Sequence, residues 1–262
     1  MLIRTISALI GAPLLLGLIY LGGAYTAFLA AVIGLLALHE YMMIGRKLEI
    51  KIWTKTTFFV ALVWILSLSL GSKEWMFPFL IVWLLFALGW MGIRYPQVQF
   101  SEVGYNVLGV IYTVVLSSHL FLLRSLERGM AWAFFTFILV WTTDTFAYLI
   151  GRALGRHPLA PRVSPNKTIE GSIGGLLGAM LVGLAASRFM GGMPWTSFLG
   201  LSLIVGVSAQ IGDLFESALK RSAKDKDSGL LIPGHGGFLD RFDSMLFAFP
   251  IVYYWVLFWM TR

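Results

Sequence analysis

Acidic side chains inside long apolar stretches are the first feature of this sequence that could carry chemistry. Asp144 lies in VWTTDTFAYLIG, with Tyr148 one helical turn further on the same face, and Asp213 lies in a second apolar stretch. An aspartate near the middle of a membrane helix costs about 2.5–3.5 kcal/mol on insertion scales. Each must face the interior of a helix bundle or a wet cavity, either as a bond between helices or as part of a functional site.

Asp213 belongs to a polar stripe. Gln210, Asp213, Glu216 or Ser217, and Lys220 recur every three or four residues. This spacing places them on one face of a helix. The stripe leads into a polar loop at 220–243, and a second polar loop spans 152–170. Loops of this length in a compact protein are usually functional or disordered. The apolar residues within 220–243 need burial, which argues against disorder.

Four carboxylates, Asp144, Asp213, Asp240 and Asp243, are expected on the same side of the protein as these two loops, which are rich in Lys and Arg. Hard oxygen ligands suit Mg²⁺, which binds one or two carboxylates and completes its shell with water and substrate phosphate. Asp240 and Asp243 are three residues apart and share a face if the last helix begins near them. Capping of that helix is the simpler interpretation, and it explains one aspartate better than two.

Two short motifs accompany the carboxylates. PGHGG, at 233–237, resembles phosphate-binding loops because glycines let backbone N–H groups approach an anion, and His235 is either a turn residue or a phosphate donor. SPNKTIEG, at 164–171, suggests Thr168 as a helix N-cap with Glu170 in the first turn. The glycines that follow predict a small face for close helix packing. They are Gly171, Gly174, Gly175 and Gly178.

The elements that position these residues are predicted to be membrane helices. The chain has 262 residues, of which 58% are hydrophobic and 13% charged. A hydrocarbon core about 30 Å thick needs roughly 20 apolar helical residues. Counting apolar segments of about this length, we expect an all-α polytopic membrane protein with about nine transmembrane helices. The segments are 6–22, 24–44, 56–71, 75–93, 104–123, 130–151, 170–190, 197–220 and 244–260.

The distribution of cations predicts the orientation. With nine spans, 15 of the 20 Lys and Arg residues fall on one side, which places the N-terminus in the cytoplasm and the C-terminus outside. A cleaved signal peptide at 1–25 is the alternative, and it would leave the other spans oriented as before. We expect one integral membrane domain over 1–262, with N-terminal spans in 1–123 and catalytic spans in 130–262. We attribute the net charge of +7 to the cations that set the membrane orientation and that attract lipid headgroups. We do not expect nucleic acid as a partner.

From Ser217 to Asp243 the chain resembles, position by position, the signature of phosphatidate cytidylyltransferases, also called CDP-diacylglycerol synthases. SPNKTIEG and DTFAY resemble upstream elements of the same family. The matching positions are Ser217, Lys220, Arg221, Lys226, Asp227, Gly229, Ile232, Pro233, His235, Gly236, Gly237, Asp240, Arg241 and Asp243.

The resemblance implies that the phosphate of phosphatidic acid attacks the α-phosphorus of CTP, which releases pyrophosphate and gives CDP-diacylglycerol. It implies Mg²⁺, with a second cation such as K⁺ beside it, a homodimer, and a multi-pass location in the cell inner membrane. On this basis Asp213, Asp240 and Asp243 are expected to be the principal metal ligands, with Asp144 as a fourth carboxylate acting through water. The expected catalytic and phosphate-binding residues are Lys220, Ser164, Lys167, Thr168, Arg221, Lys226, His235 and Arg241.

Transporters, other lipid enzymes and scaffold proteins share some of these sequence features. A transporter also carries carboxylates inside the membrane, but an ion path needs them at both faces. A CTP-using lipid kinase would release CDP, and the motif of CDP-alcohol phosphotransferases, DGxxAR followed by GxxxDxxxD, does not occur in the chain. A scaffold protein would use the loop at 220–243 only as a docking surface.

Overall fold

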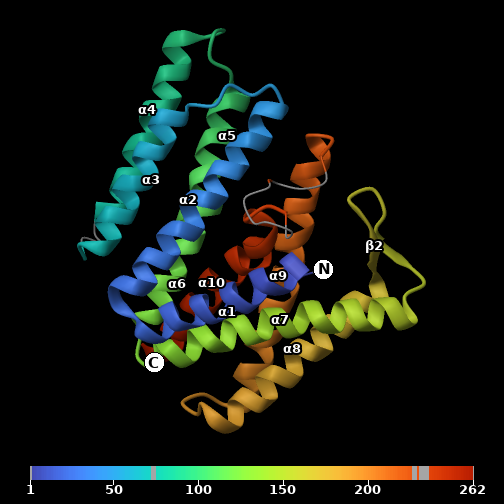
Figure 1. The fold of residues 1–262 in the computed structure, drawn as a ribbon. Coiled ribbons are helices and arrows are strands. Elements are labelled where there is room, and N and C mark those ends of the chain that lie inside the picture. The colour runs from blue at the N-terminus through green and yellow to red at the C-terminus, as the bar shows by residue number, and fades with distance from the viewer. Residues whose placement is uncertain (1, 72–74, 226–228, 230–235, 262) are drawn as a thin grey trace. The chain divides into compact units, whose positions relative to one another are not determined.

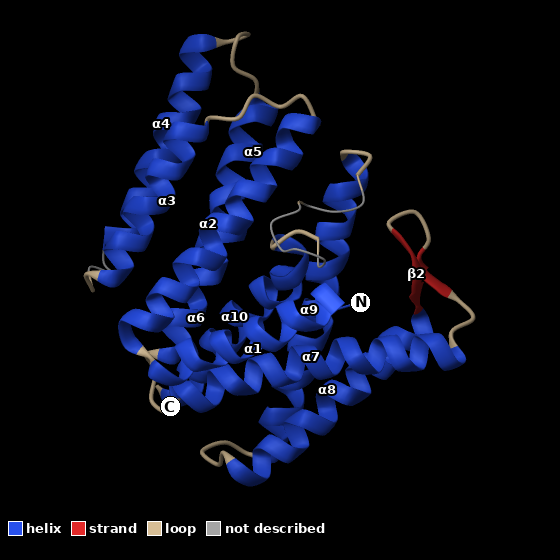
Figure 2. Cartoon of the chain, in the orientation of Figure 1, coloured by secondary structure: helices blue, strands red, loops and turns tan. Residues whose placement is uncertain are grey.

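In a computed structural model that describes residues 2–71, 75–225, 229 and 236–261, the chain is almost wholly helical (Figures 1 and 2). Side chains are described from residue 9 onward. The helices in the N-terminal half are α1 (Leu2–Leu21), α2 (Gly23–Lys47), α3 (Thr54–Ser69), α4 (Met76–Arg94), α5 (Phe100–Val110) and α6 (Leu116–Arg124), the last two joined by a π-helical turn η2 (Ile111–Val115). The others are α7 (Gly129–Leu154), α8 (Ile169–Phe189), α9 (Trp195–Ser222) and α10 (Leu239–Met260).

Each predicted span coincides with one of these helices when α5, η2 and α6 are taken as one rod. Among the described residues, seven helices are long and apolar enough to cross a membrane by length and composition. The chain is therefore a multi-pass membrane protein, and the all-α class is confirmed for its body. Two apolar stretches are shorter, Leu9–Leu21 in α1 and Thr54–Ser69 in α3. A total of nine spans and the orientation of the termini stay predictions.

The chain divides into two compact units, and each contains segments that are distant in sequence. The first comprises Met1–Phe121 and Ser222–Leu239, and the second comprises Leu122–Arg221 and Asp240–Arg262. The loop between α9 and α10 thus packs with the N-terminal helices. Asp240, where α10 enters the second unit, is also one of the predicted site residues.

Helix α2 is central to the first unit, where it contacts α1, α3, α5 and η2. Its buried Tyr41 stacks on Tyr105 of α5 with ring centroids 4.3 Å apart, and the Tyr105 hydroxyl donates to the Tyr41 carbonyl at 2.7 Å. The buried Asn106 side chain accepts from the backbone N–H of Trp53 at 2.9 Å and donates to the carbonyl of Lys51. A polar group at this depth is tolerated because its hydrogen bonds are made.

In the second unit, α7 and α8 pack along most of their length through the predicted glycine face. A methyl group on Gly171 would lie 2.7 Å from the carbonyl oxygen of Ala147, and one on Gly175 would lie 2.9 Å from that of Thr143. Only hydrogen at these positions lets the two backbones approach so closely. The prediction of a packing face is confirmed, and it fixes the position of α7, which carries Asp144.

The loop between α7 and α8 contains a small hairpin that the sequence analysis did not predict. Strand β1 (Pro158–Ala160) pairs antiparallel with β2 (Ser164–Thr168). Glu170 accepts from the backbone N–H of Arg156 at 3.1 Å and pairs with His157 at 2.5 Å, which closes the base of the hairpin. The Thr168 hydroxyl accepts from the N–H of Gly171 at 3.1 Å, so its predicted role as N-cap of α8 is confirmed.

Candidate functional site

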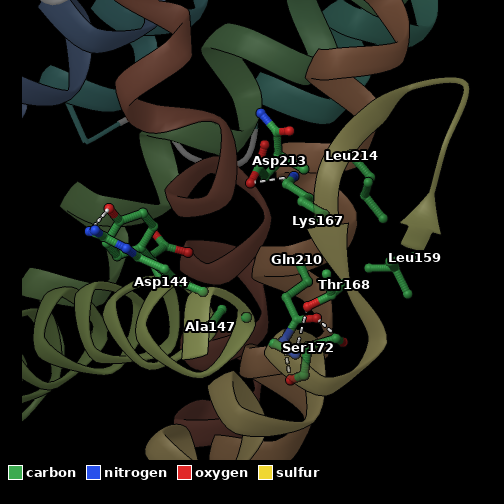
Figure 3. Close-up of a pocket in the computed structure, with 14 residues that line it drawn as sticks. Asp144, Ala147, Leu159, Lys167, Thr168, Ser172, Gln210, Asp213 and Leu214 are labelled. Atoms are coloured by element: carbon green, nitrogen blue, oxygen red, sulfur yellow. Dashed lines mark hydrogen bonds and ion pairs between the residues drawn. The ribbon is translucent and has the colours of Figure 1, made fainter. Parts of the chain in front are cut away.

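A cavity of about 510 Å³ opens in the second unit between α7, the hairpin, α8 and α9 (Figure 3). Its size falls in the range of small-molecule sites. Polar groups from all four elements line it. They are Asp144, Tyr148 and Arg152 of α7, Asn166, Lys167 and Thr168 of β2, Ser172 of α8, and Gln210 and Asp213 of α9.

An ion pair marks the polar end of this cavity. Lys167 extends from β2 to Asp213 on α9, with its Nζ atom 2.5 Å from a carboxylate oxygen (Figure 3). Asp144 and Asp243 both lie close enough to interact electrostatically with Asp213 and Lys167. Three carboxylates therefore lie near Lys167, which is ion-paired with Asp213, and together these four groups carry an excess of negative charge.

Asp243 reaches this group because α9 and α10 touch at a glycine. A methyl group on Gly212 would lie 2.6 Å from the backbone carbonyl oxygen of Asp243. The absence of a side chain at Gly212 lets the first turn of α10 approach α9 beside Asp213. Asp243 is buried, and one of its carboxylate oxygens accepts from the N–H of Ser244 at 2.6 Å.

Hydrogen bonds set the rotation of α9 about its own axis. The Gln210 side chain donates to the carbonyl of Ser172 at 3.1 Å, and the Ser172 hydroxyl bonds back to the amide oxygen (Figure 3). Asp213 lies almost one turn further along and accepts from the hydroxyl of Ser217 at 3.5 Å. The first part of the predicted polar stripe, Gln210 and Asp213, thus lines the cavity.

A second charged cluster lies where α9 meets α10. Lys220 is 2.6 Å from a carboxylate oxygen of Glu216, one turn before it on α9, and it also pairs with Asp240 in the first turn of α10. The side chains of Glu216, Lys220 and Asp240 are 1%, 13% and 9% exposed. Lys220 therefore neutralises buried carboxylates and joins two helices.

The remaining predicted residues are distributed around these two groups. Arg221 donates from Nε to the carbonyl of Val163 at 3.2 Å, which ties the end of α9 to the hairpin. Ser164 begins β2, and Arg241 is exposed in the first turn of α10. Lys226 and His235 lie outside the described residues.

The structure thus brings together Asp144, Lys167, Asp213 and Asp243, as the sequence analysis expected of one site, and it pairs Asp240 with Lys220. Glu216 was named only as an alternative to Ser217 on the polar stripe, yet it completes the second cluster. Arg152 was counted only as a loop cation, and it lines the cavity with its guanidinium bonded to the Tyr148 hydroxyl at 3.2 Å. Its position at the end of a predicted span was the available signal.

The carboxylate group fits a hard divalent cation. Its ligands are oxygen atoms, and one lysine does not balance three carboxylates. Among the described residues no three His, Asp or Glu side chains are arranged as a complete set of metal ligands. Mg²⁺ does not need such a set, since it usually retains waters and takes its other ligands from substrate phosphates.

Comparison of the sequence with known proteins identifies the family of this chain. The sequence model of the cytidylyltransferase family matches residues 2–259. The chain belongs to the cytidylyltransferase family. The phosphatidate cytidylyltransferase of Staphylococcus aureus (strain COL) is 34% identical over 257 residues, which cover 96% of this chain and 97% of that protein. Those of Staphylococcus haemolyticus (strain JCSC1435) and Staphylococcus epidermidis (strain ATCC 12228 / FDA PCI 1200) are 33% and 34% identical over 258 residues, with the same coverage of both chains.

The match to the cytidylyltransferase family extends over nearly the whole chain. It includes the N-terminal helices, where the sequence analysis found no family motif. The resemblance noted from Ser217 to Asp243 is therefore one portion of a full-length similarity. Both charged groups, around Asp213 and around Lys220, belong to the matched region. They are the natural candidates for the chemistry of the family.

The contact at Gly212 predicts a loss of activity without loss of the fold. In Gly212→Ala the new methyl group must push the first turn of α10 away from α9, which separates Asp213 from Asp243. A misplacement of this size lowers transfer of CMP to lipid by up to about a hundredfold. Gly200→Ala is the matched control on α9, because its methyl group would meet only the Trp255 ring at 3.7 Å. Equal activity of the two variants would show that the close approach is not needed.

The second cluster predicts a loss of stability. Lys220→Met leaves the buried Glu216 and Asp240 without their common cation, which lowers the free energy of unfolding by about 3–5 kcal/mol. Thermal unfolding in detergent measures the change. Adding Glu216→Gln recovers part of it, because one of the two charges is then removed. The exposed Lys224 is the control, and Lys224→Met leaves the midpoint within error. An unchanged midpoint in Lys220→Met would contradict the assignment of Lys220 as a buried counter-ion.

Proposed function

We propose that this chain is a phosphatidate cytidylyltransferase that uses Mg²⁺ and works at the cytoplasmic face of the cell inner membrane. The transferase activity follows from the family and from relatives of nearly equal length. The observation that supports a site for it is the group of Asp144, Asp213 and Lys167 in the lining of the cavity, with Asp243 close enough to interact with them electrostatically.

The reaction joins two anionic reactants. A phosphate oxygen of phosphatidic acid attacks the α-phosphorus of CTP, the bond from that phosphorus to the bridging oxygen of the β-phosphate breaks, and pyrophosphate leaves with the bonding electrons. The product is CDP-diacylglycerol. A protein nucleophile is not needed for this transfer, so catalysis consists of positioning and of neutralising charge.

The residues divide between these two tasks. Lys167 and Arg152 both line the cavity, where they can hold phosphates. Thr168 and Ser164 on β2 are supporting donors, and Arg221, Arg241, Lys226 and His235 complete the proposed phosphate-binding set. Lys220 and Asp240 keep α9 and α10 together beside the site.

Mg²⁺ would be held by Asp213 and Asp243, with Asp144 acting through water. When bound, the ion supplies positive charge that stabilises the phosphate oxygens and the leaving pyrophosphate. The set proposed from the sequence also contained Asp240. Asp240 pairs with Lys220 in the second cluster, whereas Asp213 pairs with Lys167 at the cavity, so Asp240 is left out of the proposed ligand set. A second cation such as K⁺ and a homodimer belong to the same proposal and rest on the family resemblance.

The proposed reaction is tested with purified protein, cytidine-labelled CTP, phosphatidic acid and Mg²⁺. We expect label in the lipid fraction and one pyrophosphate for each labelled lipid, and no label after chelation of Mg²⁺. Asp213→Asn and Asp243→Asn each lower the rate at least about a hundredfold, because the carboxylates that hold the cation are lost. Glu127→Gln, in the exposed turn before α7, retains full activity. A transporter or a scaffold protein would leave the lipid unlabelled, and a kinase would release CDP.

The proposed orientation is tested with single cysteines, since the natural sequence contains none. We expect Glu127→Cys to react with a membrane-impermeant maleimide in intact cells. Arg162→Cys, at the exposed tip of the hairpin, should react only after permeabilisation, because the cation-rich loops lie inside. The reverse pattern would place the site on the outer face, and labelling of both positions in intact cells would rule out an odd number of spans between residues 127 and 162.

A further inference from the structure

A buried glutamate of the N-terminal helices holds the backbone at the start of α10. Glu40 on α2 is 1% exposed. Its two carboxylate oxygens accept separately from the backbone N–H groups of Phe238, at 2.8 Å, and of Leu239, at 2.7 Å. Both oxygens are thus used on consecutive amides, which fixes the direction of the chain as well as its position.

The two hydrogen bonds to the Glu40 carboxylate are stronger than hydrogen bonds between neutral groups. A carboxylate that accepts from backbone N–H groups makes charge-assisted hydrogen bonds, and the N-terminal end of a helix favours negative charge. The first N–H groups of a helix have no partner within it, and a buried one needs an acceptor from elsewhere. Glu40 meets both needs, although it is about 200 residues from α10 in the sequence. A charged side chain is retained at this depth because these donors compensate its burial.

The same face of α2 also holds the other end of the α9–α10 loop. Lys47 lies seven residues after Glu40, about two helical turns, and forms an ion pair with Asp225. Gly229, between the two anchored ends, lies directly against the Glu40 carboxylate. A methyl group on Gly229 would be 2.5 Å from one of its oxygens. The loop is therefore fitted to Glu40 at both Gly229 and Phe238.

We propose that Glu40 is a positioning residue for the cytidylyl transfer: by holding the amides of Phe238 and Leu239, it fixes where α10 begins and hence where Asp240 and Asp243 lie. Leu239 is the first residue of α10, so the two aspartates follow within its first turn and a half. Both carboxylate oxygens of Glu40 bind backbone N–H groups, so its role is assigned to positioning. It acts through the backbone that carries Asp243, which gives the N-terminal unit a part in the reaction. This inference rests on the proposed function.

The test compares Glu40→Gln and Glu40→Ala with wild type in the labelled-CTP assay. Gln keeps one acceptor oxygen at the same position, so we expect activity to fall about tenfold in Glu40→Gln and further in Glu40→Ala. The Mg²⁺ concentration for half-maximal activity rises in both variants, since Asp243 is displaced. Hydrogen exchange of the peptide covering 236–247 becomes faster in the same order.

Two controls separate positioning from general damage. Leu38→Ala removes a fully buried side chain on α2 and lowers the unfolding temperature, but it leaves the Mg²⁺ requirement and exchange of 236–247 as in wild type. Glu49→Gln removes an exposed carboxylate just after α2 and changes none of these readouts. If Leu38→Ala raises the Mg²⁺ requirement as much as Glu40→Ala does at equal loss of stability, the role of Glu40 is merely structural.

A double substitution tests the contact directly. Gly229→Ala drives a methyl group into the carboxylate, and we expect it to lower activity about tenfold when Glu40 is present. In the Glu40→Ala background the same change costs no further activity, because the clash and the hydrogen bonds are already gone. Losses that multiply would overturn the proposal. The exchange measurement needs no turnover, so an inactive wild type would refute the proposed function, while unchanged exchange in Glu40→Ala would refute the positioning role.

Discussion

Charge inside helices that cross a membrane must be compensated locally, because neither lipid nor packed apolar side chains can solvate it. The described part of the chain meets this constraint in three ways. Lys220 neutralises Glu216 and Asp240, backbone N–H groups compensate Glu40, and Lys167 pairs with Asp213. Of the described groups, the one around Asp213 has the larger excess of carboxylates, because three lie near Lys167 whereas two pair directly with Lys220. That imbalance distinguishes a site for a cation from the ion pairs that hold the bundle together.

Glycine is the residue that lets these groups meet. Gly171 and Gly175 bring α8 against α7, and Gly212 brings α10 against α9. Each contact is between backbones, so the helices cannot slide without a clash, and side chains on either side keep a fixed separation. The hairpin then extends Lys167 from outside the bundle to Asp213. The two helix pairs and the hairpin each supply part of the same charged group.

The sequence predicts the helices and much of this site, but not its pairings. Hydropathy is enough to locate each apolar helix, and counting cations by side is enough to place Asp144, Asp213 and Asp243 together. Which lysine meets which aspartate depends on helix rotation, set here by the bond between Gln210 and Ser172. The hairpin escaped prediction because SPNKT lacks the alternation of apolar and polar residues that marks a strand. The role of Glu40 could not be predicted because its partners are main-chain amides, which every residue type except proline provides.

The charge balance also bears on how two polyanions can enter a site that has three carboxylates in or beside it. Asp144, Asp213 and Asp243 together with Lys167 carry a formal charge of about −2 when all are ionised, which repels CTP and phosphatidic acid alike. A bound divalent cation would bring this group to neutrality, and Lys167, no longer the only counter-charge for Asp213, would become available to a phosphate. In the proposed reaction the nucleotide would therefore bind together with the cation or after it. The ion pair between Lys167 and Asp213 would then be the resting arrangement of a lysine that binds phosphate during the reaction.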